Sequence, residues 1–183
     1  MPRLKEVAEI LIDADTLWNE AGDFSSLARW HPQVSGISVS DEPAGRLRVL
    51  RFKAGAEQLE RLHVADAEHR VYRYSIERTG LPVRDYTAEF RIEAVDVYRS
   101  RLVWEARFTL ADPSDDRTVE RIRHFLHEGA ASLQAKYRPY AEREPDGVET
   151  AIADADKKVR TGTANEPIRN TPPAGAWNDT SSD

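Results

Sequence analysis

Strict alternation of apolar and polar residues covers much of the first 111 residues and predicts a β-rich fold. In the stretches 71–77, 86–92 and 102–110 the even-numbered residues are mostly apolar, and a period of two places them on one face of a sheet. Related patterns predict strands at 4–13, 34–41, 47–53, 56–65, 70–78, 83–96 and 101–111. Because the separators are short and turn-like, we expect the strands to form an antiparallel meander.

Two short helices are predicted between the first and second strands. Asp15 is the expected N-cap of a helix over 16–21, since its side chain can accept hydrogen bonds from the free amides of the first turn. A second helical turn at 25–29 should end at Trp30-His31-Pro32, because the residue before a proline avoids the helical region.

After residue 114 the apolar period changes to steps of three and four, which predicts one long helix. Its apolar stripe contains Val119, Ile122, Leu126 or Phe125, Gly129, Leu133 and Tyr137. The fold class is therefore α+β: a curved antiparallel sheet of about seven strands wrapped around a C-terminal helix. Space left between helix and sheet would suit a small, mostly apolar ligand.

The last part of the chain differs in composition. From Ala141 onward it contains no Leu, Phe or Tyr and has four prolines, so we expect a domain at 3–140 and a poorly ordered tail at 141–183. Trp177 is the one sizeable apolar anchor of that tail.

Charge and composition argue against several classes of protein function. The formal charge of −6 is spread along the chain without a basic stripe, which argues against nucleic acid as a partner. There is no cysteine, and no apolar run approaches the roughly 18 residues of a membrane span. Phosphate-binding glycine loops and a nucleophilic serine elbow are also missing. These features predict a cytoplasmic protein without a cofactor, and leave a homodimer open.

Glu60 is the most informative single residue. In the strand that contains it, the phase set by Leu62 and Val64 turns Gln58 and Glu60 toward the inner apolar face. An unpaired carboxylate is costly there, which favours a ligand cavity over a solid core. Apolar surroundings favour the protonated form near neutrality, so Glu60 is a candidate general acid or base.

Two structural roles compete with catalysis by Glu60. The carboxylate could pair with an arginine such as Arg51, or accept hydrogen bonds from Tyr72 or Tyr74, and simply hold the interior of the sheet together.

Other inward-facing residues extend the candidate site. Tyr86 is a candidate catalytic donor, and His31 a candidate acid or base at the cavity entrance. The candidate ligand-binding residues are Trp30, Gln58, Leu62, Tyr72, Tyr74, Phe90, Trp104 and Phe108. The aromatic rings suit a planar ligand, but they suit plain core packing equally well.

His124 and His127 lie three residues apart on the predicted helix, beside Glu128. The known paired-histidine zinc motifs use a separation of four residues, so no metal site is predicted here.

A series of short motifs resembles the START-like helix-grip (SRPBCC) superfamily and, within it, the polyketide cyclase/dehydrase family. The motifs include Trp30-His31-Pro32, Glu60-Arg61-Leu62 and Leu81-Pro82-Val83-Arg84-Asp85-Tyr86, in a series that covers about residues 4–138. The resemblance implies the same helix-grip fold, and it implies cyclisation or dehydration of aromatic polyketides. Because the superfamily also contains lipid carriers and hormone receptors, fold alone does not fix function.

The sequence is therefore compatible with two functions. In the first, the protein is a cofactor-independent cyclase or dehydratase for a polyketide-like or other carbonyl-bearing apolar molecule, with Glu60, Tyr86 and His31 as its catalytic groups. In the second, the same cavity carries or senses an apolar small molecule without changing it.

Overall fold

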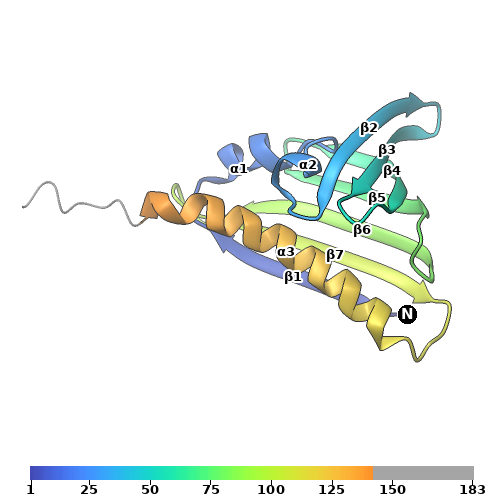
Figure 1. The fold of residues 1–183 in the computed structure, drawn as a ribbon. Helices are drawn as coiled ribbons and strands as arrows, with labels where there is room; N and C mark the ends of the chain where they lie inside the picture. The colour runs from blue at the N-terminus through green and yellow to red at the C-terminus, as the bar shows by residue number, and fades with distance from the viewer. Residues whose placement is uncertain (142–183) are drawn as a thin grey trace, which may run out of the picture. The chain divides into compact units, whose positions relative to one another are not determined.

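The computed structural model describes residues 1–141, which form one curved seven-stranded antiparallel sheet wrapped around a long helix (Figure 1). The strands are β1 (Arg3–Ile10), β2 (Val34–Glu42), β3 (Gly45–Phe52), β4 (Glu57–Asp66), β5 (Val71–Arg78), β6 (Val83–Ala94) and β7 (Ser100–Leu110). Their order in the sheet is β1-β7-β6-β5-β4-β3-β2. The predicted fold class is confirmed, and strands β2 to β7 form the predicted antiparallel meander. β1 is the edge strand next to β7.

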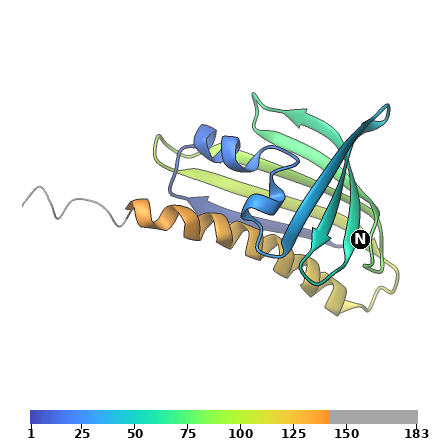
Figure 2. The same cartoon turned by 45° about the horizontal axis from the view of Figure 1, so that its top comes forward.

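Three helices complete the described fold: α1 (Ala14–Ala21), α2 (Leu27–Trp30) and α3 (Asp116–Ala141). Figure 2 shows α3 crossing the concave face of the sheet, with α1 and α2 beside it. Lys136 of α3 pairs with Glu20 of α1 at 2.8 Å, and the Ser132 hydroxyl donates to the Trp30 carbonyl at 2.6 Å. The C-terminal half of α3 is therefore tied to both short helices.

Gly129 lets α3 approach the sheet closely. A Cβ atom at this position would lie 2.7 Å from His31 Cδ2 and 3.0 Å from Trp104 Cζ3. Real Cβ atoms do not sit so close to ring carbons, so only glycine allows this contact.

The inner face predicted from the alternation is the core. Tyr72, Phe90, Trp104 and Phe108 are almost fully buried, as is Leu126 on α3. The alternation is irregular in β4, whose register against β5 shifts between Leu59 and Glu60 and again between Leu62 and Val64; Val64 is exposed. Glu60 lies between the two shifts and faces inward, with 2% of its surface exposed.

The start of α1 differs from the prediction. Its N-cap is Asp13, whose Oδ1 accepts from the Thr16 amide at 2.8 Å, whereas the side chain of Asp15 pairs with Arg70 at 2.7 Å. The expectation for Asp15 was wrong because β1 ends at Ile10, three residues earlier than the apolar pattern predicted, so that the helix begins at Ala14. The predicted tail begins at Ala141, which is the last residue of α3; its remaining residues, 142–183 with Trp177, lie beyond the residues that the structure describes.

No helix within residues 1–141 is both long and apolar enough to cross a membrane.

Candidate functional site

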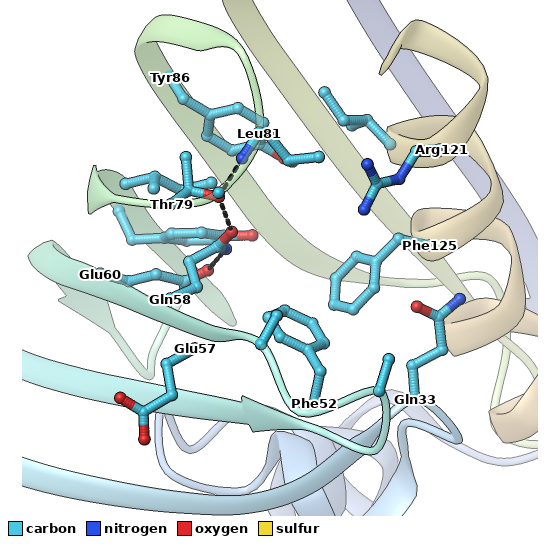
Figure 3. Close-up of a pocket in the computed structure, with 16 residues that line it drawn as sticks. Gln33, Phe52, Glu57, Gln58, Glu60, Thr79, Leu81, Tyr86, Arg121 and Phe125 are labelled. Carbon is cyan, nitrogen blue, oxygen red and sulfur yellow. Dashed lines mark hydrogen bonds between the residues drawn. The ribbon is translucent and has the colours of Figure 1, made fainter. Parts of the chain in front are cut away.

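A cavity of about 250 Å³ lies between the N-terminal half of α3 and the strands β3 to β6 (Figure 3). Its lining comes from both layers and from the turns at their edge: Gln33, Phe52, Ala54, Ala56, Glu57, Gln58, Glu60, Tyr74, Ile76, Thr79, Gly80, Leu81, Tyr86, Arg121, Ile122 and Phe125. Most of these side chains are apolar or uncharged, which suits a compact organic molecule.

A chain of hydrogen bonds forms the polar end of the cavity. Glu60 Oε1 accepts from Gln58 Nε2 at 2.6 Å, and the Thr79 hydroxyl donates to Gln58 Oε1 at 2.9 Å. Thr79 Oγ1 also accepts from the Leu81 amide at 3.2 Å. The network thus joins the carboxylate in the sheet to the β5–β6 turn, and it fixes which oxygens face the cavity (Figure 3).

Arg48 completes this network from the next strand. Its Nε donates to Glu60 Oε2 at 2.5 Å and its Nη1 donates to the Phe24 carbonyl at 2.5 Å, while its guanidinium lies 3.9 Å from the centre of the Phe24 ring. Burial opposes the charged form of Arg48, but Glu60 beside it raises its pKa above the ordinary value. Arg48 and Glu60 therefore form a fully buried ion pair, which costs stability if either partner is removed alone.

This pairing identifies the structural partner of Glu60. The carboxylate is ion-paired to an arginine, but the partner is Arg48; Arg51 instead lies 3.4 Å from Glu57 at the surface. Both oxygens of Glu60 already accept hydrogen bonds, Oε1 from Gln58 and Oε2 from Arg48. Glu60 can still accept from a ligand, since each oxygen has two lone pairs.

Two of the three inward tyrosines line the cavity, and the third does not. Tyr74 accepts from the Trp104 indole at 3.2 Å, and Tyr86 stacks on Phe108 with ring centres 5.7 Å apart. Burial, together with the nearby Glu60, raises the pKa of Tyr86, so its hydroxyl stays protonated and acts as a neutral donor. Tyr72 is outside the lining, and burial raises its pKa to about 12.

His31 is not at the cavity entrance, so that expectation was wrong. It is 2% exposed, its ring stacks on Phe125 with centres 3.9 Å apart, and its Nε2 bonds the Phe125 carbonyl at 2.9 Å. Its Nδ1 accepts from the Gln33 amide at 3.2 Å. Burial lowers the pKa of His31 to about 4, so the ring is neutral at pH 7 and ties the loop to α3.

The remaining predicted ligand-binding residues pack the filled part of the interior. Trp30 contacts both Phe90 and Trp104, with ring centres 5.9 Å apart in each case. None of the following lines the cavity: Trp30, Leu62, Tyr72, Phe90, Trp104 and Phe108. They were predicted because they share the inner face with Glu60, but α1, α2 and the centre of α3 cover that part of the face.

Several lining residues were missed by the sequence analysis. Phe52 lines the cavity, and Arg48, which is not in the lining, is the missed partner of Glu60. Both residues share the inner parity of β3 with buried Leu50, and this signal could have found them. Phe125 and Arg121 belong to the long helix, where the apolar stripe left Phe125 and Leu126 as alternatives; Leu126 faces the core and Phe125 the cavity.

The helix histidines make separate surface contacts, each with a different carboxylate. His124 lies 3.1 Å from Glu128, and His127 lies 3.1 Å from Glu6. Among residues 1–141, no group of three or more His, Cys, Asp or Glu side chains is arranged to hold a metal ion.

A curved sheet that grips a C-terminal helix defines the START-like helix-grip class, and sequence comparison narrows it. The chain belongs to the family described as polyketide cyclase / dehydrase and lipid transport, whose model matches residues 1–138. A search among curated proteins found no match.

Solved structures share this fold. XoxI from Bacillus cereus is 26% identical with a TM-score of 0.70, over 75% of this chain and 96% of that one. A Thermobifida fusca protein is 28% identical with a TM-score of 0.63, over 75% and 93%. The ZhuI aromatase/cyclase from Streptomyces sp. R1128 is 18% identical with a TM-score of 0.60, over 78% and 94%, a likeness of fold alone.

Proposed function

We propose that this protein binds a compact, largely apolar small molecule that carries a hydroxyl or similar donor group. The observation that supports it is the combination of an apolar cavity with one buried acceptor cluster, Glu60 and Gln58, at its polar end. A donor group entering the cavity would meet a carboxylate that is already desolvated and fixed. Hydrogen bonds to charged groups are stronger than neutral ones, so the cluster would select ligands with a donor.

Catalysis is the second candidate, favoured by the fact that Glu60 and the protonated Tyr86 line the same cavity. Removal of a proton next to a carbonyl needs a base, and the developing enolate needs a donor. Glu60 would take the proton, and the Tyr86 hydroxyl would stabilise the enolate oxygen. The family and the aromatase/cyclase relative of similar fold agree with this chemistry.

Binding can be tested with 2-naphthol, a small fluorescent donor, and 2-methoxynaphthalene, which lacks the donor. We expect the wild type to bind 2-naphthol about tenfold tighter, because a hydrogen bond to a charged acceptor contributes about 1.5 kcal/mol or more. The informative variant is Arg48→Met with Glu60→Leu, which removes both charges and leaves no unpaired ion.

In that double variant the preference for 2-naphthol should disappear while the fold, checked by circular dichroism, is retained. If neither naphthalene binds the wild type, or if the double variant keeps the preference, the proposed acceptor role is wrong.

Chemistry can be tested separately with 2-tetralone, whose α-protons exchange slowly with D₂O. The enzyme reading expects faster exchange with the wild type, measured by NMR, and a loss of about 10²-fold or more in the double variant. Binding without accelerated exchange favours the carrier or sensor reading.

A further inference from the structure

Arg121 stands at the opening of the cavity without a counter-ion. It lies on the exposed surface of α3, one turn before Phe125, and its side chain extends toward the cavity (Figure 3). Within residues 1–141 it has no ion pair or hydrogen bond to another side chain. This sets it apart from the other arginines near the cavity.

Both carboxylates that line the cavity already have cationic partners. Glu60 is paired with Arg48 at 2.5 Å, and Glu57 lies 3.4 Å from Arg51. The third charged residue of the lining is Arg121. Gln33, the other polar residue on that side, donates its amide to Glu128. The lining therefore has one unbalanced charge, and it is positive.

The two polar ends of the cavity differ in chemistry. At the inner end an acceptor cluster is neutralised by Arg48, and at the opening a guanidinium is free to bind an anion. Apolar side chains such as Phe52, Ile76 and Phe125 lie in the wall between them. A guanidinium presents paired N–H donors that match a carboxylate in geometry and charge.

We propose that the ligand is an anionic, hydroxyl-bearing carbon skeleton whose carboxylate is held by Arg121 at the opening while its hydroxyl reaches Glu60. Arg121 is thus the residue that selects anionic ligands. This inference rests on the proposed binding function and adds the ligand class to it.

The test compares 6-hydroxy-2-naphthoate with the neutral amide of the same shape, 6-hydroxy-2-naphthamide, by fluorescence titration at low ionic strength. In the wild type the carboxylate should bind about three- to tenfold tighter than the amide, as expected for a partly exposed charge-assisted contact. Arg121→Gln should remove this ratio, and Arg121→Glu should invert it.

Arg117→Gln is the matched control. Arg117 is exposed on the same helix, one turn earlier, is absent from the cavity lining, and carries the same charge. It should keep the wild-type ratio, which separates a local contact from a general change in net charge. In the wild type, added salt should lower the ratio because exposed charges are screened.

An equal affinity for carboxylate and amide in the wild type overturns the inference, as does a ratio that survives Arg121→Gln or that is lost equally in Arg117→Gln. Those results leave the proposed function standing provided that 2-naphthol still binds. If 2-naphthol and both hydroxynaphthalene derivatives fail to bind, the proposed function fails and this inference fails with it.

Discussion

The interior of this domain has two halves that share one sheet face but differ in packing. Around Trp30 and Trp104 the space is filled by aromatic rings in edge-to-face contact, and a Cβ on Gly129 would already clash. Around Glu60, Tyr86 and Phe125 the same two layers enclose a cavity. Packing in the filled half sets the distance between α3 and the sheet. In the open half, the side chains do not fill the space at this distance, and the cavity remains.

The contact at Gly129 explains how both halves coexist. Where α3 meets His31 and Trp104, backbone lies directly against rings, and one turn earlier the larger Phe125 stands against the cavity. Buried ions need several fixed partners. In the open half Arg48 donates to the Phe24 carbonyl, and Gln58, which donates to Glu60, accepts from Thr79 of the β5–β6 turn. Rigidity in one half thus supports a preformed site in the other.

The largest effect is expected from splitting the buried ion pair. Arg48→Met alone leaves Glu60 buried and unpaired, and should lower the free energy of unfolding by about 3–5 kcal/mol. Adding Glu60→Leu should restore most of it, because the remaining charge is gone. Urea unfolding of both variants checks this, and equal stability of single and double variants would contradict it.

Truncation of one ring in each half gives a direct comparison. Phe90→Ala, in the filled half and fully buried, should cost about 3–5 kcal/mol. Phe125→Ala enlarges an existing cavity from a partly exposed position, so we expect a smaller loss of about 1–2 kcal/mol. Chemical denaturation measures both, and equal losses would show that the open half is packed like the core.

Glycine substitutions repeat the comparison with smaller changes. Gly129→Ala places a Cβ against two rings and should cost about 1–3 kcal/mol despite the better helix propensity of alanine. At Gly80, in the turn that lines the cavity, no atom lies within 4 Å of an added Cβ. Gly80→Ala should therefore change stability by less than about 0.5 kcal/mol. Thermal and urea unfolding of the pair test this difference.

Acid should weaken the filled half through His31. Burial lowers its folded pKa to about 4 from the ordinary value of 6.5, so the unfolded chain binds the extra proton first. Stability from the neutral ring is present above about pH 6.5 and is lost as the pH falls toward 4. Between pH 7 and 5 the loss should be roughly 1–2 kcal/mol. His31→Gln should flatten this dependence, and an unchanged pH profile in that variant would contradict the assignment to His31.

The fold could be predicted because period and turn spacing act locally. The inward phase of Glu60 was correct, although the register of β4 against β5 shifts on both sides of this residue and Val64 is exposed. The choice of Arg48 as its partner needed the register of β3 against β4, which pairs Arg48 directly with Glu60.

The division into a filled and an open half could not be predicted from alternation. Tyr72 and Tyr74 have the same parity on one strand, but only Tyr74 lines the cavity. What separates them is a contact between distant segments: Trp18 of α1 packs against Tyr72, whereas Phe24 contacts both rings. His31 was misplaced for the same reason, because its burial depends on α3, which follows it by more than eighty residues.

The central claim is that a preformed cavity beside Glu60 binds a small molecule while the aromatic half stays closed. A titration of the ¹⁵N-labelled full chain with 2-naphthol, followed by backbone amide shifts, tests it most directly. The account predicts saturable shifts at Thr79, Gly80, Leu81 and Ile122, and little change at Leu27 and Trp30. Shifts centred on Leu27 and Trp30, or no saturable shift at all, would contradict it.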